Sequence, residues 1–339
     1  MVFNIPSTAV VSPKLISPIV APSHYTKALG EKEHFASMET TDTLYRVVKP
    51  VASLASVGQL WEHKRLNQEL NATQIKNPHY LVQASYEFDI RRSSLFNRTM
   101  RDHGVDFLNA NQKLVMQAIA QTLRNICWFG AGVGEGLLNG VTNFVFGNDP
   151  TNNGSTLETY SPNFLSKKLL QMARMLVDES YNAVDEIVIF GSNRVINAIS
   201  TQIQNLMDSQ KDGGGVDSTS GLIKRVLETA FADKGLKVSI YTEPKFMGAG
   251  GNANTDKLVM IAPRVNLKGN YEQWEQDINA LGELNTQEAN TIMDFGAETI
   301  KLTNINVNPN KPKGEGYAVV SSGLTLRKEA VVMANLQVK

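Results

Sequence analysis

The sequence predicts a mixed α+β fold, on the basis of three observations. One amphipathic helix of about 20 residues is predicted within residues 106–127. Residues 183–263 alternate short apolar runs with segments of helical periodicity, and residues 298–338 are typical of strands. With 339 residues, the chain is long enough for one large domain or two modest ones.

The composition is that of an ordinary globular protein, with 42% hydrophobic and 19% charged residues. Lys and Arg total 33, as do Asp and Glu, and this zero net charge argues against a protein whose main task is to bind nucleic acid. The one cysteine, Cys127, excludes an intrachain disulfide and fits a reducing cytoplasm. The sequence has no apolar run of about 18 residues and no basic signal-peptide start, so we expect no membrane span and no secretion.

The first 35 residues are predicted to form an extended arm rather than a helix. Proline fixes φ and removes a backbone donor, and four prolines interrupt the segment: Pro6, Pro13, Pro18 and Pro22. The segment has too few apolar residues to build a core of its own. We therefore expect it to lie on a neighbouring subunit.

Residues 42–90 mix short strand-like runs with polar spacers, which indicates a mostly β excursion. Within it, Leu81–Ile90 is typical of a strand. Residues 93–104 follow as a short helix, with serine at the N-cap and Gly104 where the helix should stop.

The long central helix is the strongest local prediction. Asp106 is its expected N-cap, and its apolar residues follow the spacing of one helix face: Phe107, Leu108, Leu114, Val115, Ala118, Ile119, Leu123 and Ile126. At 1.5 Å per residue, it would be roughly 30 Å long.

A second amphipathic helix is predicted over residues 161–180. Its apolar stripe is Leu165, Leu169, Met172, Ala173 and Leu176, and its polar face is Lys167, Gln171, Arg174 and Asp178. The following elements are a strand at Ile187–Phe190, helices at 192–207 and 221–235 separated by a glycine-rich linker, and strands at 236–242, 257–263, 298–307, 316–327 and 330–338.

The stretch WFGAGVGEGLLNG, residues 128–140, raises the possibility of a phosphate-binding loop. A dinucleotide fingerprint would need a third glycine at position 135 or 137, where Glu135 and Leu137 stand, and a strand before the glycines instead of a helix. A P-loop would need a Lys-Ser/Thr pair after the last glycine. We therefore predict a helix stop and a turn with positive φ, and no saturable nucleotide binding.

Other chemistry is sparse. The five histidines, His24, His34, His63, His79 and His103, form no i, i+4 pair and no HExxH motif. Cys127 lies on the apolar face of the long helix, as expected for a buried thiol rather than a nucleophile. We accordingly assign no catalytic, cofactor-binding or metal-ligating residue and expect no cofactor.

The order of a short helix, a long helix, Phe129-Gly130, several glycines and Gly136-Leu137-Leu138-Asn139 resembles the major capsid proteins of tailed bacteriophages. The related encapsulin shell proteins share this order. The resemblance covers about residues 93–339, and its remaining matches are the helix at 161–180, the strand at Ile187–Phe190 and the segment Tyr317–Val332. Glu329 stands where the family often has proline.

The resemblance implies an α+β tailed-phage major capsid fold. Its expected parts are an N-terminal arm (1–41), an extended β-loop (42–90), a peripheral domain with the spine helix (91–182), an axial domain (183–298) and C-terminal strands that return to the peripheral and axial core (299–339). The arm and the loop would lie over neighbouring subunits, so deleting residues 1–35 should prevent normal assembly and leave a folded subunit.

The implied function is a structural, non-enzymatic subunit that self-assembles into an icosahedral or prolate shell around double-stranded DNA. Its implied partners are many copies of itself in hexamers and pentamers, a portal, a decoration protein and the packaged DNA, contacted without sequence specificity and without a membrane. The implied location is the virion, after assembly in the host cytoplasm. The alternatives are an encapsulin-like nanocompartment and a small-molecule enzyme built on residues 183–263.

Two further expectations concern assembly. Residues 1–92 lack the heptads of a coiled scaffold, so we expect no cleavable scaffolding domain and a separate scaffolding protein instead. The densest basic patch is Arg91, Arg92, Arg98 and Arg101. These arginines are either solvated helix or subunit-interface residues or groups that face packaged nucleic acid, and the zero net charge favours the first interpretation.

Overall fold

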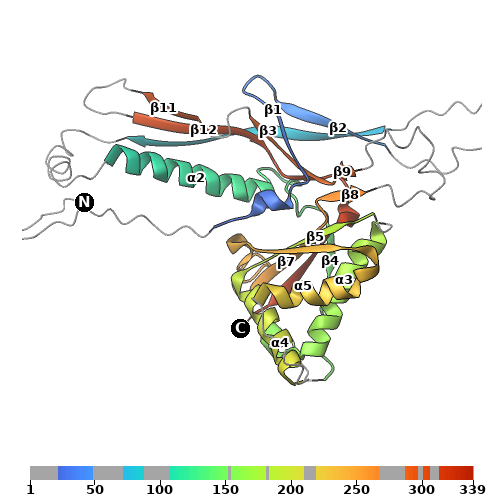
Figure 1. The fold of residues 1–339 in the computed structure, drawn as a ribbon. Coiled ribbons are helices and arrows are strands. Elements are labelled where there is room, and N and C mark those ends of the chain that lie inside the picture. Colours follow the sequence, from blue (N-terminus) through green and yellow to red (C-terminus); the bar gives the residue numbers. More distant parts are fainter. Residues whose placement is uncertain are drawn as a thin grey trace, which may run out of the picture.

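The fold has two main layers (Figure 1). An upper sheet lies over helix α2, and a lower five-stranded sheet has helices α3, α4 and α5 packed against it. The computed structural model describes residues 22–48, 72–87, 107–151, 154–180, 183–209, 219–266, 287–296, 301–305 and 313–338.

The upper sheet has seven strands: β1 (Glu31–Ala36), β2 (Asp42–Val48), β3 (Ala72–Glu87), β10 (Thr291–Gly296), β11 (Lys301–Ile305), β12 (Lys313–Ser321) and β13 (Leu324–Thr325). Their order is β1-β10-β12-β3-β2, with β11 on β12 and β13 on β10. The 16-residue strand β3 pairs antiparallel with β2 along its first half and with β12 along its second half.

Helix α2 (Phe107–Phe129) lies along the underside of β3 and β12 (Figure 1). The predicted stripe is correct for Val115, Ile119, Leu123 and Ile126, which are buried in one core with Val82, Ala318 and Val320 of the sheet. Leu114 and Ala118, also placed in that stripe, are instead exposed. The sheet therefore contacts a narrower face of the helix than the apolar pattern indicates.

The lower sheet has the order β4-β14-β7-β5-β6. Its strands are β4 (Thr142–Phe144), β5 (Glu186–Gly191), β6 (Lys237–Thr242), β7 (Thr255–Ile261) and β14 (Val331–Gln337), and its helices are α3 (Pro162–Glu179), α4 (Asn193–Ser209) and α5 (Thr219–Ala230). The smaller elements are the ribbon β8 (Arg264–Asn266) and β9 (Gln287–Ala289) and the short helices η1 (Tyr25–Ala28), η2 (Leu157–Thr159), η3 (Ala232–Lys234), η4 (Pro244–Phe246) and η6 (Lys328–Ala330).

The lower sheet is buried on both faces, which explains its near-continuous apolar strands. On one face, Ile187, Ile189 and Met260 pack with the α3 stripe, and all five predicted stripe residues of that helix are buried. On the other face, Val188 and Phe190 join the core that contains α2. One sheet therefore contributes to two cores.

The expectation that the first 35 residues lie on a neighbouring subunit is wrong for residues 25–35, although β1 is extended as predicted. They form η1 and β1, and β1 pairs parallel with β10. Ala28 is fully buried, and the Gly30 N–H donates to the Thr291 carbonyl at 2.8 Å. The four prolines all precede Ser23, and the pairing partner is some 260 residues away, so the local pattern gives no sign of it.

The predicted strand at Leu81–Ile90 begins earlier, at Ala72, and ends at Glu87. Its second half packs on α2 of the same chain, so this part of the β excursion needs no neighbouring subunit for burial. The predicted short helix at 93–104, the N-cap Asp106 and most of the 211–221 linker lie outside the described residues.

Strand β10 was not predicted, although all six of its residues are buried. Its sequence, TIMDFG, contains a threonine, an aspartate and a glycine, which break the apolar run that marks a buried strand. The final strands are split between the sheets: β11 and β12 belong to the upper one and β14 to the lower one.

The glycine stretch is a turn, as predicted. Four of its glycines have positive φ: Gly130 (77°), Gly134 (84°), Gly136 (92°) and Gly140 (66°). After this turn the chain folds back on the end of α2, because the N–H groups of Leu137 and Leu138 donate to the carbonyls of Cys127 and Trp128 at 2.9 and 3.2 Å. A phosphate loop would leave its N–H groups free for the ligand.

A buried carboxylate joins the arm, α2 and the lower sheet. Glu243, directly after β6, is fully buried and accepts hydrogen bonds from the Ser23 hydroxyl at 2.5 Å and the Trp128 indole N–H at 3.2 Å. The Arg124 guanidinium lies 3.8 Å from its other oxygen. Burial, and secondarily the charge of Glu243, raises the pKa of the adjacent Cys127 thiol, which is buried as predicted.

Gly136→Ala should lower the free energy of unfolding by about 2–4 kcal/mol, measured by denaturant titration. A methyl group there would lie 2.6 Å from the Trp128 carbonyl oxygen, in addition to the strain of positive φ. Gly147→Ala is the matched control, because Gly147 has φ of 71° but open space around it. Its loss should be about 1–2 kcal/mol, and equal losses in both variants would contradict the steric argument.

Glu243→Ala should cost about 3–5 kcal/mol of unfolding free energy, because it leaves the buried Arg124 charge, the buried Trp128 N–H and the half-buried Ser23 hydroxyl without this acceptor. Glu243→Gln keeps an acceptor oxygen and should cost less. The exposed Glu329 is the control, and its change to alanine should stay within about 0.5 kcal/mol. A Glu243→Ala variant as stable as the control would show that the carboxylate does not join these elements.

Candidate assembly surfaces

The first surface of interest is formed by β2 (Asp42–Val48) and the half of β3 that pairs with it (Ala72–Pro78). We call this pair the β2–β3 extension. At about 3.3 Å per residue, β3 extends over roughly 50 Å, and β2 covers only its first half. Four large apolar side chains on β1, the following turn, β2 and β3 are exposed: Phe35 (63%), Met38 (62%), Leu44 (55%) and Leu81 (49%). Large apolar side chains with this exposure are candidates for contact with another protein.

The base of this extension is organised around Asp294 of β10, whose side chain is completely buried. The register of β1 on β10 shifts between Glu33 and Ala36, and the Asp294 carboxylate accepts the N–H groups of Phe35 and Ala36 at 2.6 and 2.9 Å. It also accepts the Thr43 hydroxyl of β2 at 2.6 Å. One carboxylate therefore holds β1 and β2 on the main sheet.

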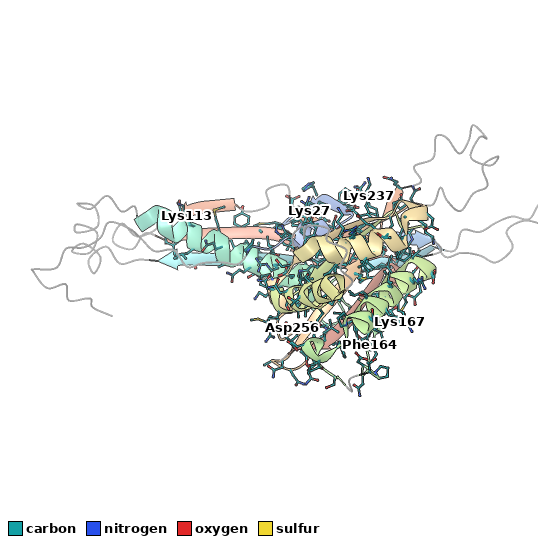
Figure 2. The ribbon with its side chains drawn as sticks, turned by 60° about the horizontal axis from the view of Figure 1, so that its bottom comes forward. Lys27, Lys113, Phe164, Lys167, Lys237 and Asp256 are labelled. Carbon is teal, nitrogen blue, oxygen red and sulfur yellow. The ribbon has the colours of Figure 1, made fainter. Side chains whose placement is uncertain are left out.

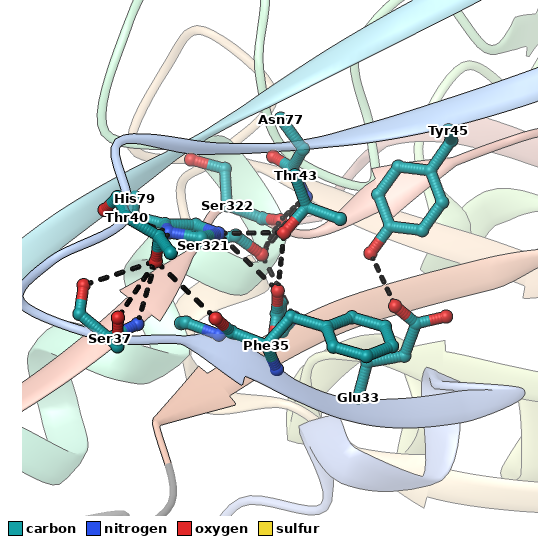
Figure 3. A network of polar contacts seen from close by, with 12 residues as sticks. Glu33, Phe35, Ser37, Thr40, Thr43, Tyr45, Asn77, His79, Ser321 and Ser322 are labelled. Carbon is teal, nitrogen blue, oxygen red and sulfur yellow. Dashed lines mark hydrogen bonds and ion pairs between the residues drawn. The ribbon is translucent and has the colours of Figure 1, made fainter.

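Strand β3 joins the same network (Figure 3). The His79 Nε2 atom lies 2.8 Å from the Thr43 hydroxyl and 3.3 Å from Asp294. The Asn77 amide donates to the Ser321 hydroxyl of β12 at 2.9 Å, and that hydroxyl accepts the N–H of Asp294 at the same distance. The network thus connects five strands: β1, β2, β3, β10 and β12.

A second pair at the base links β1 and β2 directly. The Tyr45 hydroxyl donates to Glu33 at 2.9 Å (Figure 3). Burial raises the pKa of Glu33, the Tyr45 hydrogen bond opposes this shift, and the charge of Asp294 adds to it. Burial and the Glu33 carboxylate raise the pKa of Tyr45, so this hydroxyl remains a donor.

A second exposed apolar surface lies where α2 ends. Val133, at the tip of the glycine turn, is fully exposed, and Phe129 and Met247 are 39% and 60% exposed. The turn is fixed from inside by Glu135, which accepts the Tyr80 hydroxyl at 2.6 Å and the Ser322 hydroxyl. Burial raises the pKa of Glu135, but these hydrogen bonds outweigh it and the net pKa is lowered.

The loop that carries Met247 is also anchored by a buried acid. Asp256 accepts the Gly248 N–H at 2.8 Å and the Ser192 hydroxyl, and it pairs with Arg194 at 2.5 Å. Burial raises the pKa of Asp256, whereas Arg194 and Ser192 lower it further than burial raises it. Both exposed apolar loops are therefore held by carboxylates at their base.

A cleft of about 670 Å³ lies between the N-terminal segment and the β5–β6 end of the lower sheet. Its lining includes Asp185 and Glu186, which accept hydrogen bonds from Asn266 at 2.8 Å and from Ser239 at 3.2 Å. It also includes Lys237, which Figure 2 shows beside Lys27. The residues that line the cleft include no histidine, serine or cysteine.

The basic patch and two of the histidines, His63 and His103, lie outside the described residues. The His24 ring lies tilted against the Tyr241 ring, with 5.1 Å between the ring centroids, and His34 is exposed on β1. Within the described part of the chain, no three His, Cys, Asp or Glu side chains are grouped to hold a metal ion. In that same part, no helix is long and apolar enough to cross a membrane.

Sequence reasoning missed the Asp294 network. Its members come from residues 35–43, 77–79, 294 and 321–322, and none of these segments carries a chemical motif. The one available signal was an aspartate within the apolar run TIMDFG, because a buried carboxylate needs partners.

No protein-family model and no curated protein matches the sequence. Solved structures do match over almost the whole chain. The capsid of Myoviridae phage XM1 aligns with a TM-score of 0.67 at 13% identity, covering 96% of each chain. The capsid of cyanophage P-SCSP1u aligns with a TM-score of 0.62 at 7% identity, covering 98% of this chain and 94% of the other.

The capsid of cyanophage Pam1 aligns with a TM-score of 0.59 at 11% identity, covering 99% of this chain and 98% of the other. These matches cover the helices and both sheets together, at identities too low to show more than the shared fold. The chain has the tailed-phage capsid fold, as its order of a short helix, a long helix, several glycines and Gly136-Leu137-Leu138-Asn139 predicts.

Proposed function

We propose that this chain is the structural subunit of a phage capsid that self-assembles in many copies and encloses double-stranded DNA. The observation that carries the proposal is the alignment with the phage XM1 capsid over 96% of both chains. The two exposed apolar surfaces support it, because a shell subunit must bury such surfaces against its neighbours.

The alternatives are less well supported. An encapsulin-like shell would have the same fold, but the three solved structures named above are phage capsids. An enzyme would need convergent titratable groups at a cleft, whereas Asp185 and Glu186 already accept hydrogen bonds from the chain itself. We therefore propose a structural protein rather than an enzyme.

The assignment of residue ranges to the parts of the capsid fold is also a proposal. Residues 1–22 would be the true arm, since the segment that follows belongs to the cores. Residues 42–90 would be the extended loop, 91–182 the peripheral domain, 183–298 the axial domain and 299–339 the returning strands. A separate scaffolding protein, a portal, a decoration protein and non-specific DNA contacts would complete assembly of the virion in the host cytoplasm.

Purified full-length protein should form megadalton spherical particles, because the fold and its exposed apolar surfaces are those of a shell subunit. Size-exclusion chromatography and negative-stain microscopy, with and without a co-expressed scaffolding protein, measure this. A population that stays monomeric or dimeric under both conditions would contradict a shell function.

Removing residues 1–22 should prevent normal particles but leave a folded subunit, because Ser23 and all later elements keep their contacts. Circular dichroism and particle counts in micrographs separate these two effects. Removing residues 1–36 is the contrasting variant, which should also unfold the subunit because it deletes β1 and the buried Ala28. Normal particles from the shorter truncation would show that the arm is dispensable.

A further inference from the structure

The Asp294 network contains a histidine that is almost completely buried. The side chain of His79 is 3% exposed and that of Asp294 is 0% exposed. An imidazole is the side chain that ordinarily gains or loses a proton between pH 5 and 8, so the hydrogen bonds of this network depend on how many protons His79 carries.

The hydrogen-bond partners of Nε2 require a proton on that nitrogen. Thr43 has one hydroxyl hydrogen, and it is directed at Asp294 over 2.6 Å. The 2.8 Å contact between Nε2 and the Thr43 oxygen is therefore a hydrogen bond only if Nε2 donates. The same proton faces the Asp294 carboxylate at 3.3 Å.

The partners of Nδ1 favour a second proton. Nδ1 lies 3.2 Å from the Thr40 carbonyl oxygen, which can only accept, and 2.9 Å from the Thr40 hydroxyl. That hydroxyl has its own acceptors, the carbonyls of Ser37 and Phe35 at 3.3 and 3.4 Å. With both ring nitrogens donating, every group has a partner, and the imidazolium balances the buried Asp294 charge.

Loss of the Nδ1 proton would change this arrangement. The lone pair of Nδ1 would then face the Thr40 carbonyl, and the Thr40 hydroxyl would have to turn its hydrogen toward the ring. Asp294 would keep its hydrogen bonds from Phe35, Ala36 and Thr43 but lose its counter-charge. The contacts that hold β1, the turn and β2 on the main sheet would all weaken together.

Other charged groups around the network are arranged in pairs. On β1, Glu33 accepts the Tyr45 hydroxyl, and at the start of β2, Asp42 pairs with Lys76 of β3 at 2.5 Å. Glu33 is the carboxyl close to Asp294 with a raised pKa. It is therefore the second group whose titration could change the stability of this network. Any test must separate Glu33 from His79.

We propose that His79 and Asp294 form a pH-responsive latch at the base of the β2–β3 extension. The latch is closed when His79 carries two ring protons and loosens when the ring becomes neutral as the pH rises. This inference goes beyond the proposed shell function: it concerns the single subunit, and in a shell it would set how firmly the extension is held.

Hydrogen–deuterium exchange of the unassembled full-length subunit between pH 5 and 9 tests the latch. After correction for intrinsic exchange rates, exchange in residues 31–48 and 72–87 should rise about tenfold with pH, which corresponds to about 1.4 kcal/mol. The midpoint should coincide with the ring titration of His79 followed by NMR in the same protein. Helix α3 should show no such change.

His79→Gln should abolish the pH-dependent rise, because the glutamine amide can donate hydrogen bonds but cannot titrate. His34→Gln, at an exposed histidine on β1, and Glu33→Gln should both retain it. A rise that persists in His79→Gln, is lost in Glu33→Gln, or has a midpoint away from the His79 titration would overturn the latch. If His79→Gln does not fold, the coincidence of midpoints in the unaltered protein decides. None of these results depends on particle formation, so failure of the latch and failure of the shell function are distinguishable.

Discussion

The burial of Trp128 at the end of α2 is the interaction on which the rest of the structure depends. Its indole is fully buried, with edge-to-face contacts to Phe190 of β5 at 4.9 Å and Phe246 of η4 at 4.8 Å. Its N–H donates to Glu243. A large aromatic with a satisfied polar tip contributes both apolar burial and a fixed orientation. The upper sheet, carried on α2, is thereby held on the lower one.

That joint explains why the chain must turn immediately after Trp128. Leu137 and Leu138 are buried, so the residues after the glycines return to the same core. Glycine adopts the positive φ required next to the end of the helix without the steric penalty of a Cβ atom. The glycines that raised the possibility of a ligand loop therefore allow the chain to pack back on the end of α2. Val133, which lies between them, remains exposed.

Local pattern predicted α2 and α3, because one face of each helix meets a core, and it predicted β5, because burial on both faces makes that strand a continuous apolar run. It did not predict β1 or β10, whose pairing joins residues separated by about 260 positions in sequence. It also overestimated the buried face of α2, since Leu114 is apolar but exposed. The Asp294 network could not be predicted, because its residues become neighbours only when five strands have assembled.

Phage capsid structures with 7–13% sequence identity to this chain share its fold. This low identity restricts which interactions can stabilise the fold in all of them. At such identity, most pairs of contacting side chains differ between these chains. What two such chains can share is the placement of buried positions: a sheet apolar on both faces and a helix with one narrow apolar face. Exposed residues such as Phe35 and Leu44 are free of that constraint. The surfaces proposed for assembly can therefore diverge between shells while the fold of the subunit is kept.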